Sequence, residues 1–338
     1  MDLGKADSDM QSTEEIECMN LIIDQIEYYL PERLITNDYL SEHSGIDADF
    51  LQNKIGIHQR HIAGENESIS DMALAASNKL FEKTDITRKD IDFLIVCTQN
   101  PDYKLPTTAC IIQDRLDLPN SCFAFDINLG CSGFVYSMII ADSFIKSGII
   151  KNALLIMVDQ YSKIIDYNDK NTASLFGDAA SAILLKQDEN KRGIIDSTWG
   201  TDGSGFDKLI LHNSGIVSDP EKSPTLYMNG REIFKFSMKV VPQSVNQILN
   251  RNNLKISDID YFVLHQANNY MLREIQKRLE IDDSQMIIDM TNYGNTVSST
   301  IPITLKNLID AKKIAPGQLL ILSGFGVGLS WGTILYKT

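Results

Sequence analysis

Three residues in this sequence are of types that could together carry out chemistry on acyl thioesters. Cys131 lies in the stretch "NLGCSGF", where an apolar run ends and a helix is expected to begin. A thiol at the start of a helix faces the positive end of the helix dipole, so we expect a lowered pKa. The neighbouring glycines, Gly130 and Gly133, would allow a sharp turn and the approach of an acyl group. Such a thiolate could attack a thioester and become an acyl-enzyme.

The other two residues could stabilise negative charge on an oxygen atom. His265 directly follows an apolar run in "VLHQANNY", and Asn295 follows a glycine in "YGNTVSS". A neutral imidazole and a carboxamide can both donate hydrogen bonds to one oxygen. That pair would suit the enolate that forms when a malonyl thioester loses carbon dioxide. A lone cysteine or histidine is more often structural, so this interpretation requires that the fold brings the three residues together.

An internal sequence repeat indicates that the fold could bring the three residues together. The segment "KDIDFLIVCTQN" (89–100) resembles "SDIDYFVLHQAN" (257–268), and "KNALLIMV" (151–158) resembles "PGQLLILS" (316–323). Between them, "FDINLGCS" (125–132) resembles "IDMTNYGNT" (288–296). These three matches occur in order at offsets of 164 to 168 residues, which predicts a duplicated α/β unit. When the two copies of the repeat are aligned, Cys97 corresponds to His265 and Cys131 corresponds to Asn295.

The expected elements fit a layered α/β architecture. The pattern predicts helices over 68–84 and over 134–148, the second ending at Gly148. The short apolar runs "FLIVC" and "LLIMV" lack alternation, as is typical of strands that are covered on both faces. We therefore expect a tail over 1–18, a half with the cysteine over 19–190, and a half with the histidine and asparagine over 191–338.

Composition excludes several other classes of protein. The formal net charge of −14 argues against a nucleic-acid binder, and no apolar run approaches the roughly 18 residues of a membrane span. The polar, acidic first residues are unlike a signal peptide, so a cytoplasmic protein is expected. The five cysteines form no CxxC pair, and His58 and His61 lack further ligands, so neither a disulfide framework nor a metal site is predicted. The glycine-rich stretch "GTDGSGFDKL" (200–209) has no lysine or helix in the place that a phosphate loop requires.

Five motifs resemble the signature segments of the β-ketoacyl-acyl-carrier-protein synthase III family, which belongs to the thiolase superfamily. They are "GCSGFVY", "LFGDAASAILL", "HQAN", "YGNT" and "GFGVGLSWG", and the resemblance runs from about Asn20 to the C-terminus. It implies a thiolase-like α-β-α-β-α sandwich, a homodimer and a decarboxylative Claisen condensation. By this resemblance Cys131 is the nucleophile and His265 and Asn295 serve the malonyl thioester. Backbone N–H groups of Cys131 and Val327 would form the oxyanion hole.

The same resemblance assigns residues to the carrier of the acyl group. Coenzyme A or phosphopantetheine is expected only as a substrate carrier, with no other cofactor and no metal. Relatives hold a stacking tryptophan where this chain has Phe50, and arginines where it has Lys54, Lys170 and Tyr270. Leu105 occupies the position from which one subunit reaches the acyl site of the other, and Asn268 closes the "HQAN" motif. The acidic carrier protein would dock near a helix whose basic residues are Arg273, Lys277 and Arg278.

The predicted function is therefore a ketosynthase III-like enzyme. It would acylate its own cysteine from an acyl thioester and condense that group with a malonyl- or β-ketoacyl-thioester, in fatty-acid or polyketide-like metabolism. One alternative is an acyltransferase that forms an ester or amide on the same fold. Another is the partner subunit of a heterodimeric synthase. A degradative thiolase is disfavoured because no cysteine follows Cys131.

Overall fold

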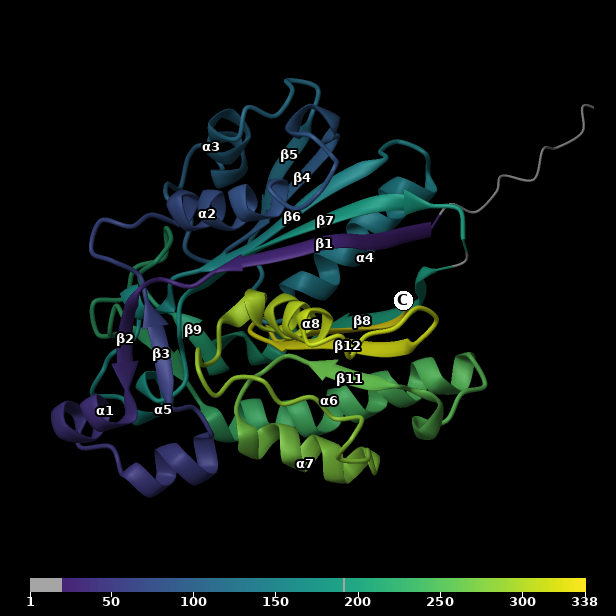
Figure 1. Cartoon of the computed structure of the whole chain (residues 1–338). Coiled ribbons are helices and arrows are strands. Elements are labelled where there is room, and N and C mark those ends of the chain that lie inside the picture. The colour runs from purple at the N-terminus through teal and green to yellow at the C-terminus, as the bar shows by residue number, and fades with distance from the viewer. Residues whose placement is uncertain (1–19, 191) are drawn as a thin grey trace, which may run out of the picture.

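The chain forms five layers, in which three layers of helices alternate with two β-sheets (Figure 1). The computed structural model describes residues 20–190 and 192–338, so the predicted tail over 1–18 lies outside the described residues. The α-β-α-β-α sandwich expected from the sequence is confirmed.

The first sheet is built from residues before position 190. Its strand order is β1-β7-β6-β4-β5, and the strands span Asn20–Tyr29, Ala179–Asp188, Asn152–Asp159, Phe93–Cys97 and Phe123–Ile127 respectively. Strand β4 pairs in parallel with both β5 and β6, and every one of its residues is buried. The two apolar runs predicted as covered strands are β4 and the centre of β6.

The second sheet is built from residues after position 192, in the order β11-β12-β13-β8. These strands span Tyr261–Leu264, Leu319–Gly326, Ser330–Lys337 and Gly193–Thr201. Strands β11 and β12 are parallel, as are β4 and β6 in the first sheet. The strand pairs that the sequence repeat identified therefore have the same relative direction in both sheets.

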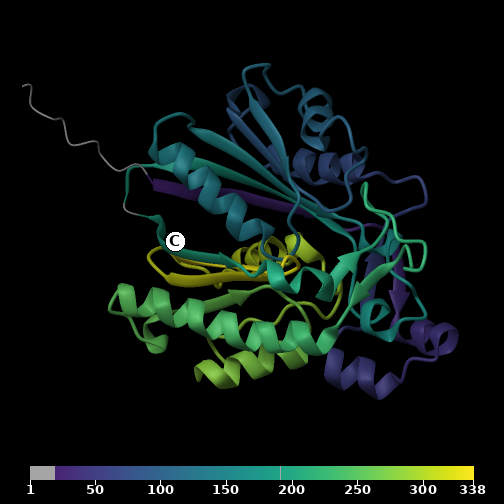
Figure 2. The same cartoon turned by 180° about the vertical axis from the view of Figure 1, so that it is seen from behind.

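Helices cover the outer faces and fill the space between the sheets. On the first sheet lie α2 (Ile69–Phe81) and α3 (Thr108–Arg115), while α6 (Gly230–Arg251) and α7 (Asn269–Leu279) cover the second. Between the sheets lie α4 (Gly133–Lys146) and α8 (Thr300–Asp310), and Figure 2 shows α4 from behind along this central layer.

Local signals set the ends of two of these helices. Ser68 and Asp71 form a reciprocal capping box at the start of α2, as the Ser/Asp pattern predicted. Helix α4 ends where Gly148 adopts a left-handed conformation, with φ of 71°. The N–H of Ile149 then reaches back to the carbonyl of Phe144 at 3.2 Å, which satisfies an otherwise unpaired helix end.

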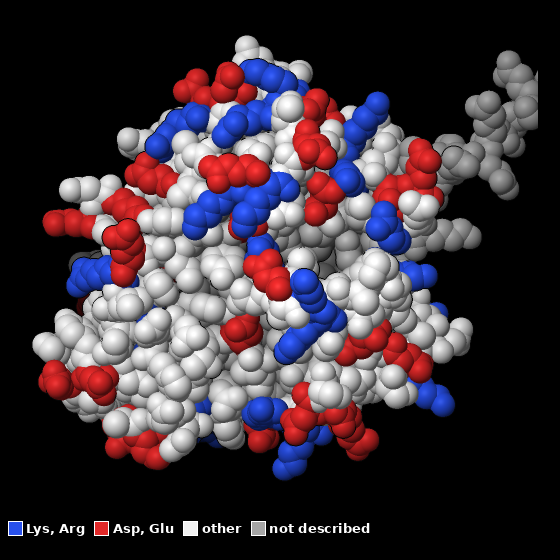
Figure 3. Space-filling view, in the orientation of Figure 1, with Lys and Arg blue, Asp and Glu red and all other residues white. Residues whose placement is uncertain are grey.

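Smaller elements extend the molecule beyond one end of the sheets. They comprise β2 (Arg33–Thr36), α1 (Asn37–Ser44), the π-helical turn η1 (Phe50–Ile55), β3 (Gln59–Ile62), α5 (Lys170–Ala173), β9 (Leu209–Leu211) and β10 (Leu226–Met228). Strands β2 and β3 form a hairpin-like pair, as do β9 and β10. None of the helices in the described ranges combines the length and the hydrophobicity that crossing a membrane requires. On the face shown in Figure 3, basic and acidic side chains are interspersed.

Hydrogen bonds between small buried side chains join the two parts of the molecule. The hydroxyl groups of Ser132 and Ser330 lie 2.8 Å apart, and the hydroxyl of Ser298 donates to Asp159 at 2.6 Å. Ser181 donates to Ser299 at 3.1 Å. We call these three contacts the polar seam. Because each donor must meet its acceptor, the seam fixes how the two sheets sit relative to each other.

Candidate active site

Cys131, His265 and Asn295 line one pocket of about 80 Å³. Cys131 stands two residues before the start of α4, His265 immediately after β11, and Asn295 in the loop that precedes α8. All three side chains are buried. The expectation that the duplicated halves bring these residues together is therefore met in the fold, with the cysteine coming from one half and the other two residues from the other.

The backbone of β12 passes close to the cysteine, and only glycine permits this approach. A Cβ atom on Gly326 would lie 2.9 Å from both Cβ and Sγ of Cys131. A Cβ on Gly324 would lie 2.6 Å from the carbonyl oxygen of Cys131. Contacts this short do not occur between real side chains, so the two glycines are what let β12 form one wall of the nucleophile's site.

The environment of Cys131 disfavours its thiolate, contrary to the sequence-based expectation. Burial, followed by the charge of Asp159, raises the pKa of Cys131 to about 12. The N–H groups of Cys131 and Val327 oppose this shift by hydrogen bonding to the sulfur. The predicted lowering of the pKa by the helix start is wrong because desolvation of a charged sulfur outweighs the helix dipole.

The imidazole of His265 is neutral and is held by one hydroxyl group. Burial lowers the pKa of His265 to about 3. Its Nδ1 lies 2.8 Å from Oγ1 of Thr300, and that hydroxyl also lies 3.1 Å from the carbonyl of Val297. The hydroxyl has one proton. If the hydroxyl donates to Nδ1, the ring proton is on Nε2, whereas donation to the carbonyl leaves the ring proton on Nδ1.

The carboxamide of Asn295 is oriented by the backbone around it. Its Oδ1 accepts a hydrogen bond from the N–H of Val297 at 3.0 Å. The main chain of Asn295 is fixed as well, since its N–H donates to Leu175 at 2.9 Å and its carbonyl accepts from Gly177 at 3.1 Å. Within residues 20–190 and 192–338, the Nδ2 group has a single, long contact of 3.5 Å, with the carbonyl of Ala267. An N–H donor is therefore left for a group in the pocket.

Apolar side chains form most of the remaining wall of the pocket. Phe325 packs edge-on against the His265 ring, with centroids 5.6 Å apart and an interplanar angle of 85°. Phe176, Leu209 and Met228 line the same space. An apolar pocket with a few oriented donors strengthens each hydrogen bond to a developing charge, because little water competes for it.

Three functional neighbours were not identified from the sequence. Asp159 is the last residue of β6 and accepts hydrogen bonds from the N–H of Gln99 at 2.9 Å and from the hydroxyl of Ser298. The hydroxyl of Thr300 contacts the ring of His265, and Tyr161 is buried in the same hydrophobic cluster as Cys131. The only available signal was the polar run "DQY" after an apolar strand, which sequence alone does not distinguish from an ordinary strand end.

Of the residues assigned to the acyl carrier, one lines this pocket. Asn268 lines the pocket and also caps α7, where its Oδ1 accepts from the N–H of Met271 at 2.8 Å. Lys54, at the end of η1, places its Nζ 5.3 Å from the ring centroid of Tyr270. Tyr270 in turn stacks on Phe234, with centroids 5.5 Å apart. Lys54, Tyr270 and Phe234 thus form a cation–aromatic stack.

Three other assigned residues lie apart from that stack. Phe50 is partly buried at the start of η1, and Lys170 is exposed in the first turn of α5. Leu105 is 87% exposed and does not line the pocket.

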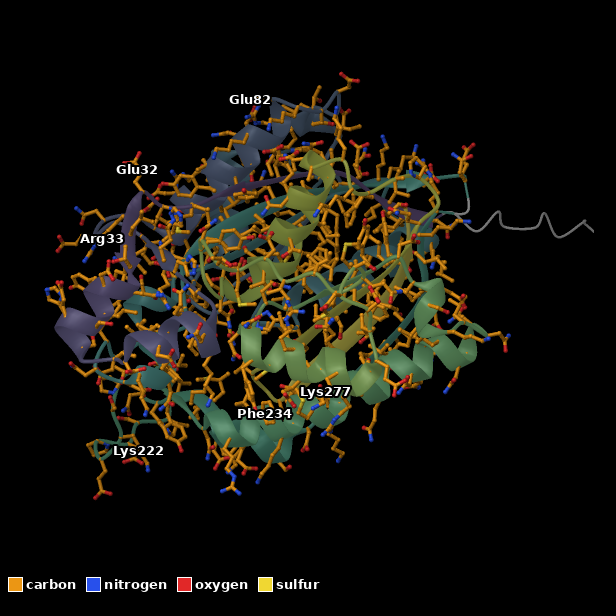
Figure 4. All side chains as sticks on the ribbon, turned by 60° about the horizontal axis from the view of Figure 1, so that its bottom comes forward. Glu32, Arg33, Glu82, Lys222, Phe234 and Lys277 are labelled. Carbon is orange, nitrogen blue, oxygen red and sulfur yellow. The ribbon has the colours of Figure 1, made fainter. Side chains whose placement is uncertain are left out.

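The basic residues of α7 differ in whether their side chains have a hydrogen-bond or ion-pair partner. Arg273 is paired with Asp283 at 2.8 Å, and Arg278 donates to the carbonyl of Met238 on α6 at 2.9 Å. The side chain of Lys277 has no hydrogen-bond or ion-pair partner among the described residues. Figure 4 shows Lys277 and Phe234 on the same side of the molecule, on the packed helices α7 and α6.

Comparison with known proteins identifies the family. Residues 125–203 match the family described as 3-oxoacyl-[acyl-carrier-protein] synthase III, and residues 249–338 match its C-terminal part. The chain is 39% identical to a β-ketoacyl-[acyl-carrier-protein] synthase III of Clostridium perfringens, with 91% of this chain and 96% of that one covered. It is 38% identical to the enzyme of the same name from Ehrlichia canis, over 91% of this chain and 96% of that one.

Comparison with solved structures leads to the same family. A crystal structure of a 3-oxoacyl-(acyl-carrier-protein) synthase III superposes with a TM-score of 0.90 at 37% identity, covering 94% of this chain and all of that one. The priming β-ketosynthase of a polyketide biosynthetic pathway superposes with a TM-score of 0.87 at 26% identity, covering 94% of this chain and 96% of that one. This chain therefore belongs to the β-ketoacyl-acyl-carrier-protein synthase III family, and it is an acyl-transferring condensing enzyme of fatty-acid or polyketide synthesis.

Proposed function

We propose that the enzyme transfers an acyl group to Cys131 and then joins it to a malonyl or β-ketoacyl thioester. In the first step the sulfur attacks the thioester carbonyl, the carrier thiol leaves, and an acyl-cysteine forms. In the second step a malonyl thioester loses carbon dioxide and becomes an enolate. The enolate attacks the acyl-cysteine carbonyl, a carbon–carbon bond forms, the carbon–sulfur bond breaks, and the released Cys131 sulfur takes up a proton from solvent. The shared pocket of Cys131, His265 and Asn295 carries this proposal.

Each side chain has a role in this scheme. The N–H groups of Cys131 and Val327, which face the sulfur, stabilise the oxyanion during acyl transfer. Nδ2 of Asn295 and Nε2–H of His265 stabilise the enolate oxygen. The role of His265 as a donor requires that Thr300 gives its proton to Nδ1.

The first test is self-acylation. Incubation with acetyl thioesters should add one acetyl group to the protein, as measured by intact mass, and Cys131→Ala should abolish the adduct. Cys97→Ala is the matched control, because Cys97 is also buried but does not line the pocket. An adduct that survives Cys131→Ala would contradict the assignment.

The second test separates loading from decarboxylation. Asn295→Ala removes one enolate donor, which costs roughly 10²–10³ in rate at comparable sites. The variant should still acylate Cys131, while release of carbon dioxide from malonyl thioester falls by that factor. Unchanged decarboxylation would instead favour the acyltransferase that forms an ester or amide.

We further propose that the enzyme works as a homodimer in the cytoplasm on carrier-protein thioesters. Strand β5 lies at the edge of the first sheet with one side unpaired, and its Phe123 is 52% exposed. A second copy could continue the sheet across a two-fold axis and cover this edge. The four free cysteines of the described chain suit a reducing compartment. Sedimentation equilibrium should give twice the chain mass, and a Phe123→Lys variant should shift it towards the monomer.

A further inference from the structure

A buried arginine lies behind the loop that carries Asn295. Arg60, in β3, is 1% exposed, yet no carboxylate of the described chain forms an ion pair with it. Burial lowers the pKa of Arg60 to about 10, which still leaves the side chain charged at neutral pH. Because burying a charge without an opposite charge costs free energy, an uncharged side chain would serve better if Arg60 only filled space.

The guanidinium group of Arg60 joins two segments that are far apart in the sequence. Nη1 donates to Oδ1 of Asn37, the first residue of α1, at 2.7 Å. Nη2 donates to the carbonyl of Ser174 at 2.5 Å. The planar group holds its donors at a fixed angle, so the two acceptors are fixed relative to each other. The ammonium group of a lysine lacks this fork.

The segment that Arg60 holds also fixes the main chain of Asn295. Directly after Ser174, the carbonyl of Leu175 accepts a hydrogen bond from the N–H of Asn295. Two residues further on, the N–H of Gly177 donates to the carbonyl of Asn295. A shift of the segment 174–177 would therefore shift Asn295 with it.

Arg60 packs on the residue before Asn295 as well. Gly294 has a left-handed conformation, with φ of 79°, and a Cβ atom there would lie 3.2 Å from Cγ of Arg60. The chain just before β3 is bonded to the same loop, since the N–H of His58 donates to the carbonyl of Thr291 at 2.7 Å. Arg60 thus contacts both the segment 174–177 and the loop that carries Asn295.

We propose that Arg60 is a positioning residue that holds Asn295 in place for the decarboxylation step. The inference rests on the proposed function, in which Nδ2 of Asn295 stabilises the enolate. Arg60 does not line the pocket, so it acts through the segment 174–177 and through Gly294. Loading of Cys131 does not use Asn295 and should therefore not depend on Arg60.

The first experiment compares the two steps in Arg60→Met, which keeps an unbranched side chain but removes both donors. A misplacement of about 1 Å can lower a rate by about 10²-fold, so kcat for decarboxylation of malonyl-pantetheine should fall roughly 10- to 100-fold. The KM for malonyl-pantetheine and the rate at which acetyl-pantetheine acylates Cys131 should not change.

Arg251→Met is the matched control for this comparison. Arg251 likewise donates to one side chain and one backbone carbonyl, those of Asp196 and Ser197, at 2.7 and 2.6 Å. None of these three residues lines the pocket. Both steps should therefore keep their wild-type rates in this variant.

A double-mutant cycle tests whether Arg60 acts through Asn295. If it does, Arg60→Met should lower decarboxylation by no more than about twofold when it is added to Asn295→Ala, because the group that Arg60 positions is already absent. A further loss as large as that in the wild-type background would show that Arg60 acts independently of Asn295, and it would overturn the proposal.

Two more variants separate the hydrogen bonds of Arg60 from its charge and from general destabilisation. Arg60→Lys keeps the charge without the fork, and its decarboxylation rate should lie between those of the wild type and Arg60→Met. If Arg60→Met lacks a cooperative thermal transition, Arg60→Lys takes its place in both experiments, and a wild-type rate in it would overturn the proposal. Asn37→Asp keeps the acceptor and adds an opposite charge, so decarboxylation should persist and the melting temperature should rise. A loss of decarboxylation in that variant would show that the charge matters, and not the position.

The outcomes separate this inference from the proposed function. If Asn295→Ala lowers decarboxylation but Arg60→Met does not, or if Arg60→Met lowers both steps equally, the role of Arg60 is overturned and that of Asn295 stands. If Asn295→Ala itself leaves decarboxylation unchanged, the proposed function fails and this inference fails with it.

Discussion

At the scale of single residues, the environment of Cys131, the proposed nucleophile, favours the neutral thiol. A pKa of about 12 leaves almost no thiolate at neutral pH. The sulfur must therefore lose its proton as it attacks, in a site whose oriented N–H groups then bind the oxyanion. This arrangement protects the thiol from oxidation and from chance electrophiles, because both react with the thiolate.

Asp159 contributes to this protection through its charge. Its removal in Asp159→Asn should lower the pKa of Cys131 and raise the rate at which iodoacetamide alkylates it at pH 8. The rate should increase several-fold, since one pKa unit corresponds to a tenfold change in thiolate. Mass spectrometry of the labelled peptide measures the rate at Cys131, with the exposed Cys110 as internal reference. Equal rates in both proteins would show that burial alone sets the pKa.

Thr300 should decide which nitrogen of His265 carries the proton. Thr300→Val removes the hydroxyl, and decarboxylation should then fall about five- to tenfold, as expected for one hydrogen bond of about 1–1.5 kcal/mol. Loading of Cys131 should persist, and Thr300→Ser should restore the decarboxylation rate. The ¹⁵N chemical shifts of the ring report the tautomer directly. A ring proton on Nδ1 in the wild type would contradict the donor role of Nε2.

At the scale of elements, the sequence predicts the ends of helices where these ends depend on neighbouring residues. Ser68 and Asp71 mark the start of α2, and Gly148 marks the end of α4, because a cap or a left-handed turn involves only neighbours. The repeat anticipated the pocket of Cys131, His265 and Asn295.

Contacts between distant segments were not foreseeable. Asp159 meets Ser298, 139 residues later, and the pairing of Arg273 with Asp283 depends on how the chain turns after α7. The predicted lowering of the pKa of Cys131 was wrong for the same reason. A sequence shows that a helix begins there, but it does not show how completely the sulfur is removed from water.

Helix α7 offers one uncommitted cation to an acidic carrier protein. Lys277→Glu should lower kcat/KM for carrier-protein thioesters several-fold at low salt, and the difference should shrink as salt screens the charges. Activity with small pantetheine thioesters should not change. Lys222→Glu makes the same charge change in a remote loop and should have no effect (Figure 4). An equal loss in both variants would indicate a general effect of net charge.

At the scale of the whole molecule, two buried groups give the stability opposite dependences on pH. Burial raises the pKa of Asp159 from 3.8 to about 7, so between these values the unfolded chain is ionised while the folded one holds a proton. Stability therefore decreases as the pH rises through this range. His265, with its pKa lowered from 6.5 to about 3, does the reverse, and stability increases with pH over that range. From about pH 4 to pH 6.5 the two effects oppose each other.

Substitution of Asp159 should leave the pH dependence of stability that is due to His265. In Asp159→Asn, the free energy of unfolding relative to the wild type should rise as the pH increases from 4.5 to 7. The slope should approach 1.4 kcal/mol per pH unit, the value for one proton. Urea unfolding at several pH values measures this difference, in which all unaffected groups cancel. A flat difference would mean that Asp159 is already ionised in the folded protein at pH 4.5.

The polar seam has a consequence for how the protein tolerates random change. The serines at 132, 298, 299 and 330 are small, fully enclosed and joined to partners far away in the chain. They add little apolar surface, so replacing one by alanine removes little of the burial that keeps the chain folded. The same replacement should loosen the alignment of Cys131, in one half, with His265 and Asn295, in the other half. In a library that contains every substitution at these four positions, selection for product formation should therefore remove most variants. Selection for the amount of protein in the cell should remove fewer of them.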